Sequence, residues 1–171
     1  MRLATLILLL GMSAVPTRPS EAFCYEAAGN RYGISPSLLY AISKGESSFN
    51  PIAINYNTNG SYDYGLMQIN SSWEPTLRKL GIPWGTLADP CTNVMVGAWV
   101  LSQCIRDYGY TWPAVGCYNS RTPSKRDRYA ARIARIVRQG KPHQRGEKNI
   151  AITDTSKVTP WEEAFGIVAT R

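Results

Sequence analysis

The stretch Glu46-Ser47-Ser48-Phe49-Asn50-Pro51 ends a predicted helix, and after a polar segment the chain continues with Gly65-Leu66-Met67-Gln68-Ile69-Asn70. Leu38 and Ile42 precede Glu46 by two turns and one turn, so the carboxyl projects from the helix face that packs into the core. Burial and the negative end of the helix dipole both disfavour the ionised carboxylate. We therefore expect a raised pKa for Glu46, as a general acid at neutral pH requires. Helical position alone also allows a capping or surface glutamate.

On both sides of this stretch, apolar periodicity and capping signals predict a mainly α-helical domain, and few segments have the alternation of a strand. Ser35-Pro36 and Asp89-Pro90 each place a capping residue before a proline at the first helical position. The predicted helices span residues 25–32, 36–49, 73–80, 90–108, 113–119 and 123–139. Residues 52–64 are rich in asparagine and are predicted to form a loop.

Residues 1–22 have the pattern of a signal peptide. Arg2 precedes an uncharged run from Leu3 to Val15, and small residues lie at Ser20 and Ala22, where signal peptidase reads the chain. The apolar run is shorter than the roughly 20 residues that a membrane helix needs. We expect cleavage after Ala22 and export of a soluble protein to the periplasm, with one domain over residues 23–139.

All four cysteines follow residue 22, and an even count in an exported chain predicts disulfides. Cys91 and Cys104 fall on one predicted helix, about 19 Å apart at 1.5 Å per residue. A bridge needs Cα atoms within about 7 Å, so these two cannot pair and two connectivities with Cys24 and Cys117 remain. There is no C-x-x-C pair and His143 is the single histidine, so we expect neither a metal site nor a cofactor.

The positive charge is concentrated in the last predicted helix. Residues 23–122 carry six basic and six acidic side chains, whereas residues 123–139 carry six basic side chains and Asp127. Such a helix either contacts an anionic surface or is simply a solvated face. No nucleic-acid partner is expected, and we expect a monomer.

Residues 140–171 lack helical or strand periodicity and are predicted to be a largely disordered tail. Trp161, Phe165 and Val168 are spaced by four and three residues, so Pro160 can begin a short amphipathic helix. Its apolar face either docks in the groove of a partner or packs back onto the domain.

Together with Ala114-Val115-Gly116-Cys117-Tyr118-Asn119, the two opening stretches resemble the three motifs of the soluble lytic transglycosylase family. The chain is most similar to the small, single-domain members that accompany conjugation and type III or type IV secretion systems. The resemblance covers about residues 24–137 and implies a lysozyme-like helical fold. Cys117 departs from the pattern, because a small residue such as alanine is expected there.

The resemblance also implies roles for individual residues. Glu46 is similar to the catalytic acid and base, and Ser47 to its companion in the first motif. The residues similar to those of the sugar-binding groove and of the final helix are Met67, Gln68, Tyr118, Asn119 and Tyr129. Of the two disulfide connectivities left open, the resemblance favours Cys24–Cys91 with Cys104–Cys117.

The implied substrate is the peptidoglycan glycan strand. Goose-type lysozymes resemble Gly-Leu-Met-Gln-x-Asp where this chain has Asn70, so the residue at the position of the expected base is an amide. Asp63 is the nearest remaining acid, or else forms an Asx turn. A single carboxylate predicts an intramolecular reaction that forms 1,6-anhydro-N-acetylmuramic acid and opens the wall locally for a secretion or conjugation apparatus. A hydrolytic muramidase, a non-catalytic peptidoglycan-binding assembly factor and a basic membrane-disrupting peptide are the alternatives.

Overall fold

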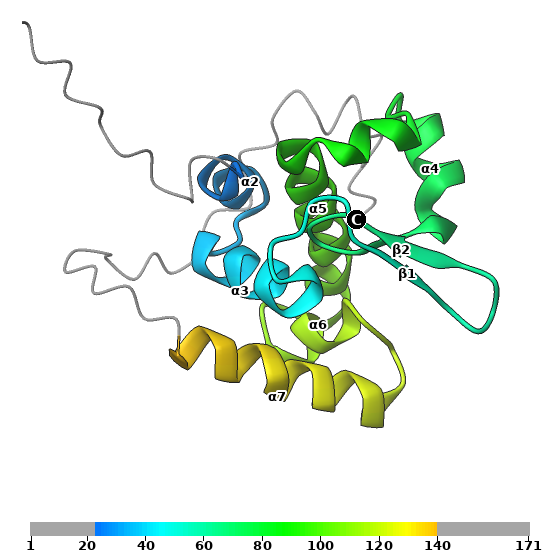
Figure 1. The fold of residues 1–171 in the computed structure, drawn as a ribbon. Coiled ribbons are helices and arrows are strands. Elements are labelled where there is room, and N and C mark those ends of the chain that lie inside the picture. Colours follow the sequence, from blue (N-terminus) through cyan, green and yellow to red (C-terminus); the bar gives the residue numbers. More distant parts are fainter. Residues whose placement is uncertain (1–22, 140–171) are drawn as a thin grey trace, which may run out of the picture.

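The computed structural model describes residues 23–139, so the predicted signal peptide and tail, residues 1–22 and 140–171, lie outside the described residues. Helices dominate the described part of the chain, as predicted, and Figure 1 shows their arrangement. The helices are α2 Tyr25–Tyr32, α3 Pro36–Ser47, α4 Glu74–Lys79, α5 Pro90–Tyr108, α6 Trp112–Cys117 and α7 Pro123–Gln139. Two 3₁₀ turns, Ser71–Trp73 and Trp84–Ala88, flank α4.

The helix starts follow the local signals in the sequence. At the start of α5, the Asp89 carboxylate accepts hydrogen bonds from the backbone N–H groups of Cys91 at 3.0 Å and Thr92 at 3.3 Å. Pro90 occupies the first helical position. Pro36 has the same place in α3, although the Ser35 side chain makes no capping hydrogen bond. Gly33, with φ of 63°, ends α2 in the left-handed conformation that glycine adopts readily.

Helix α5 runs through the middle of the molecule, and α2 and α6 pack against it (Figure 1). Val94, Ala98 and Leu101 recur at helical spacing on one face of α5 and are fully buried. Two disulfides join these helices, and both predicted pairings are confirmed. Cys24–Cys91 has a Cα–Cα distance of 5.2 Å and Cys104–Cys117 one of 5.8 Å.

Residues 52–64 contain a β-hairpin, so the prediction of a loop was wrong there. Strand β1 (Ile54–Tyr56) pairs antiparallel with β2 (Tyr62–Tyr64), which pairs with β3 (Ile69–Asn70). Asn55 lies opposite Asp63, whereas the aromatic residues alternate onto the other face. Because β1 and β2 are each three residues long, this alternation was too short to stand out from the asparagines.

Helix α7 packs against α3 and α6, and runs beneath both in the view of Figure 1. The apolar residues of α7 form a stripe on one face, where Tyr129 and Ile133 are buried and Ile136 and Val137 are partly buried. This packing brings α7 beside the C-terminal end of α3, where Glu46 is located. Among the described residues, none of the helices combines the length and the apolar character needed to cross a bilayer.

Candidate active site

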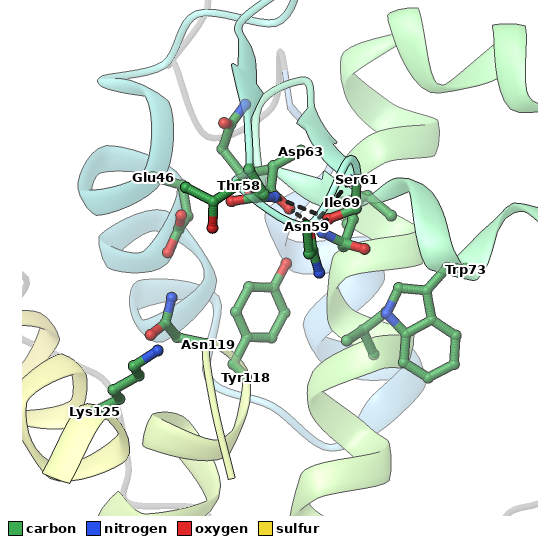
Figure 2. Close-up of a pocket in the computed structure, with 14 residues that line it drawn as sticks. Glu46, Thr58, Asn59, Ser61, Asp63, Ile69, Trp73, Tyr118, Asn119 and Lys125 are labelled. Carbon is green, nitrogen blue, oxygen red and sulfur yellow. Dashed lines mark hydrogen bonds between the residues drawn. The ribbon is translucent and has the colours of Figure 1, made fainter. Parts of the chain in front are cut away.

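A cleft of about 510 Å³ opens between the end of α3, the small sheet, α5 and the segment that follows α6. Figure 2 shows Glu46 on one side of it, Trp73 on the opposite side and Tyr118 between them. Its walls are largely polar, and the charged side chains among them are Glu46, Asp63 and Lys125.

The Glu46 side chain is 14% exposed, on the helix face that also carries the buried Leu38 and Ile42. Burial raises the pKa of Glu46 above its ordinary value of 4.5, while the neighbouring Tyr129 hydroxyl and Arg132 guanidinium act to lower it and Asp63 to raise it. The expected direction of the shift is therefore confirmed, with desolvation as its main cause.

The chain turns sharply away from Glu46 after the helix ends. Ser48 and Phe49 have φ angles of 51° and 69°, in the left-handed region, which stops α3 within two residues of the carboxylate. Directly after Glu46, the Ser47 hydroxyl donates a hydrogen bond of 2.7 Å to the carbonyl of Leu66. Ser47 thus fastens the end of α3 to the second motif and does not line the cleft itself.

Gln68 lines the cleft and braces its wall. Its amide nitrogen donates to the carbonyls of Ala53 at 3.1 Å and Gly65 at 2.8 Å, and its amide oxygen accepts from the Asn55 side chain at 2.6 Å. Both ends of the amide are engaged, so this side chain joins β1 to the second motif.

Met67 lies behind the wall of the cleft, although its motif is expected to line the sugar-binding groove. The side chain is fully buried, against α5, where a Cβ added to Gly97 would come within 2.4 Å of the Met67 sulfur. The backbone N–H of Met67 donates to Asn93 at 2.8 Å, and its carbonyl accepts from the Tyr118 hydroxyl at 2.8 Å. Met67 therefore supports the site through its main chain.

The third motif and α7 supply the two tyrosines nearest to Glu46. Tyr118 lines the cleft with the exposed Asn119, and its ring stacks on that of Tyr129 at a centroid distance of 6.4 Å. Burial raises the pKa of both hydroxyls well above 10, so both carry their protons at neutral pH. The Tyr129 hydroxyl is buried without a hydrogen bond of normal geometry within the described residues, yet lies near enough to Glu46 to influence its pKa.

Asp63 is brought into the same cleft, because β2 pairs with β3 and sets it opposite Asn70. One carboxylate oxygen accepts from the Asn70 amide at 2.7 Å and the other from the Asn57 amide at 3.0 Å. The suggestion that Asp63 forms an Asx turn was wrong, because the turn oxygen comes from Asn59, which accepts from the backbone N–H of Ser61 at 3.1 Å. The cleft thus holds a second carboxylate, oriented by two amides.

Two residues that support the site were missed in the sequence. Arg132 contacts Glu46 from α7, three residues beyond Tyr129 and so on the same side of the helix. Asn93 is fully buried on α5, accepts from Met67 and donates to the carbonyls of Tyr64 and Leu87. A polar residue within the apolar stripe of a predicted helix was the available signal for Asn93, because buried amides need partners.

Comparison with known proteins agrees with this geometry. Residues 23–134 match the family model described as the transglycosylase SLT domain. The invasion protein IagB of Salmonella typhimurium is 45% identical over 133 residues, which cover 75% of this chain and 83% of that protein. The protein IpgF of Shigella flexneri is 42% identical over 118 residues, covering 68% of this chain and 78% of that protein.

Among solved structures, the lytic transglycosylase Slt of Pseudomonas aeruginosa, in an inactive mutant form, has a similar fold, with a TM-score of 0.55. The match has 22% sequence identity and covers 71% of this chain and 24% of that chain. The lysozyme-like fold class is therefore confirmed. Fold and cleft together define a lytic transglycosylase domain, which acts on peptidoglycan. The chain belongs to the transglycosylase SLT family.

Proposed function

We propose that this protein cleaves the β-1,4 bond between N-acetylmuramic acid and N-acetylglucosamine in periplasmic peptidoglycan and forms a 1,6-anhydro sugar. The observation that carries the proposal is one carboxyl, Glu46, that is 14% exposed at the edge of a polar cleft and has a raised pKa. A cleft of about 510 Å³, open to solvent and lined by amides and hydroxyls, suits a carbohydrate chain.

In the first step Glu46 acts as the general acid. Its raised pKa favours the protonated carboxyl relative to an ordinary glutamate, so Glu46 is suited to give a proton to the glycosidic oxygen as the bond to C1 of the muramic acid breaks. Tyr118 and Tyr129 are both protonated, so neither hydroxyl competes with Glu46 as a base. The Tyr118 hydroxyl donates its proton to the Met67 carbonyl, which leaves the Tyr129 hydroxyl as the donor available beside the carboxyl.

In the second step the Glu46 carboxylate acts as the base. It takes the proton of the C6 hydroxyl of the same muramic acid, whose oxygen attacks C1 and closes the anhydro ring. Glu46 regains the proton that it gave, so the cycle is balanced without water. An attacking group on the same sugar has the rate advantage of an intramolecular reaction, which can amount to about 7–11 kcal/mol.

Asp63 supports a second candidate, the hydrolytic muramidase. A second carboxylate in the same cleft is what an inverting or retaining glycosidase uses to activate water or to attack the sugar. We favour the intramolecular reaction because both oxygens of Asp63 are engaged by amides of Asn57 and Asn70, which suits a group that orients the wall of the cleft.

Mass spectrometry of the fragments released from purified peptidoglycan tests the proposal. We expect products that end in 1,6-anhydro-N-acetylmuramic acid, each one water lighter than its hydrolytic counterpart. Products dominated by reducing ends would instead identify a muramidase. Binding to peptidoglycan without any cleavage would support the non-catalytic assembly factor.

We further propose that the enzyme opens the wall locally for a secretion or conjugation apparatus. The small size of the domain and the resemblance to the single-domain members support this role, and one relative at 45% identity bears the name invasion protein. The tail, residues 140–171, is the part of the chain proposed to contact the apparatus.

A further inference from the structure

Arg132, on α7, reaches the end of α3 at the two residues where the proposed chemistry takes place. One guanidinium nitrogen, Nη1, donates to the carbonyl oxygen of Gly45 at 2.7 Å, and the other, Nη2, lies 3.4 Å from Oε1 of Glu46. The Cζ atom lies 4.9 Å from the centroid of the Tyr129 ring. The cation is therefore held from three sides beside the carboxyl.

The close approach of the two helices at Gly45 makes these contacts a product of the fold. A Cβ added to Gly45 would lie 2.8 Å from Cδ1 of Ile133 and 3.2 Å from Cδ1 of Ile136, so a larger residue would force these α7 side chains to shift. The carbonyl of Gly45 also belongs to the last turn of α3, where carbonyls lack an intrahelical donor. Arg132 supplies that donor and is thereby fixed next to Glu46.

We propose that Arg132 is a positioning residue for Glu46, which orients the carboxyl and stabilises the carboxylate that remains after the proton has left. The inference rests on the proposed role of Glu46 as acid and base. When Glu46 protonates the glycosidic oxygen, the negative charge left on it lies beside the guanidinium, until the proton of the C6 hydroxyl neutralises it again.

The groups around Glu46 explain why its pKa is raised even though the Arg132 cation lies beside it. Burial raises the pKa of Glu46 more than Arg132 lowers it. The Arg132 side chain is 46% exposed, so water screens its charge. The titratable or charged groups that act on Glu46 from neighbouring elements are Tyr129 and Arg132 on α7, Asp63 on β2 and Tyr118 after α6.

The test is the pH dependence of kcat/KM on purified peptidoglycan, measured with the full-length protein and three variants. Arg132→Gln should move the alkaline limb to higher pH, because the ionised Glu46 loses its cation, and lower the maximal rate about tenfold, less than loss of the acid itself would. Arg132→Lys keeps the charge without the planar fork, so it should keep the limb and lose part of the rate. Arg128→Gln, which removes an exposed charge one turn earlier on α7, is the matched control and should behave as the parent.

A rate and an alkaline limb in Arg132→Gln equal to those of Arg128→Gln would overturn the proposal. So would a reduced rate with an unmoved limb, which would show a structural role alone. If Arg132→Gln does not fold, Arg132→Lys decides, because a parental maximal rate in that variant contradicts the need for the fork. Titration of the Glu46 carboxyl by carbon NMR in parent and variant tests the coupling independently of the reaction that the enzyme performs. The NMR titration can therefore show whether Arg132 influences Glu46 even if the enzyme proves not to form the anhydro product. A failure of the proposed function and a failure of this inference thus give different results.

Discussion

At the level of single residues, Glu46 is placed by short-range geometry and tuned by long-range contacts. Its helical spacing from Leu38 and Ile42 puts it at the margin of the core, where desolvation raises its pKa. Tyr129 and Arg132, from a helix more than 80 residues later, lower the same pKa. Desolvation is the largest of these influences, so the net effect is a raised pKa in a cleft whose walls are polar.

Glu46→Gln should abolish glycan cleavage, with a loss of at least about a hundredfold, because glutamine keeps the shape and cannot transfer the proton. Release of soluble fragments from peptidoglycan measures the effect. Glu26→Gln, at an exposed glutamate of α2, is the control. Cleavage by a folded Glu46→Gln protein within about tenfold of the parent rate would contradict the assignment.

The pH dependence of activity and stability should both reflect the raised pKa of Glu46. Activity should fall as the pH rises through that pKa, above the ordinary value of 4.5, because the acid step needs the protonated form. The folded state prefers the protonated carboxyl, so its contribution to stability is present at low pH and is lost as the pH rises through the raised pKa. The difference in melting temperature between Glu46→Gln and the parent should therefore shift in favour of the variant as the pH rises from about 4 to about 8, the range in which buried carboxyls titrate. A difference that shrinks with pH would contradict the shift.

At the level of elements, the sheet is attached to α5 by one buried amide. Asn93→Ala should lower the free energy of unfolding by about 3 kcal/mol, because three backbone groups lose their partner. Activity should fall as well, because Asn93 holds the backbone of Tyr64 and Met67, whose chain neighbours Asp63 and Gln68 line the cleft. Denaturant unfolding measures the first effect, and Thr92→Ala, at the neighbouring position, should change stability by less than about 0.5 kcal/mol. Equal effects of the two variants would show that the amide has no such role.

The two disulfides stabilise the domain unequally. Cys24 and Cys91 are 67 residues apart, whereas Cys104 and Cys117 are 13 apart. The longer loop restricts the unfolded chain more, so replacing both cysteines of a pair by serine should cost about 4 kcal/mol for the first pair and about 3 kcal/mol for the second. Denaturant unfolding of the two double variants checks the order, and peptide mapping without reductant checks the pairing. A larger loss from the shorter loop would contradict this account.

The hairpin and the helices differ in how well local sequence predicts them. The bounds of α2, α5 and α7 follow from caps and apolar spacing that lie within the helix itself. The strands depend on pairing between segments, which short runs of asparagine and tyrosine do not reveal. The N-G dipeptide Asn59-Gly60, between alternating aromatic residues, was the hairpin signal in the sequence.

At the level of the whole molecule, the lining of the cleft, as far as the structure describes the chain, runs from Glu46 to Lys125. A chain that ends at Gly140 should therefore cleave isolated peptidoglycan at the parental rate and yet fail to complement a deletion strain in the cell. Enzyme assay and complementation measure the two outcomes. Full complementation with unchanged thermal stability would leave the tail without either proposed role.

The melting temperature of the truncated protein distinguishes a tail that packs back onto the domain from a tail that binds an external partner. The described residues include an apolar groove of about 280 Å³ beside Val137, near the point where α7 ends; Leu38, Ile105 and Trp112 are among the residues that line it. If the tail packs back onto the domain, truncation should lower the melting temperature. An unchanged melting temperature together with lost complementation would indicate an external partner.

The local sequence was sufficient to predict the helices, to place Glu46 at the margin of the core and to exclude the Cys91–Cys104 pairing. These features follow from helix caps, apolar periodicity and the rise of the helix, which depend on residues close together in the chain. The resemblance to a family supplied the remaining disulfide connectivity and the outline of the site. The tertiary structure alone placed Met67 behind the wall, Asp63 in the cleft beside Asn70, and Arg132 against Glu46, 86 residues away along the chain. These placements depend on strand pairing and helix packing, whose energies arise between segments that are distant in sequence, so no local pattern encodes them.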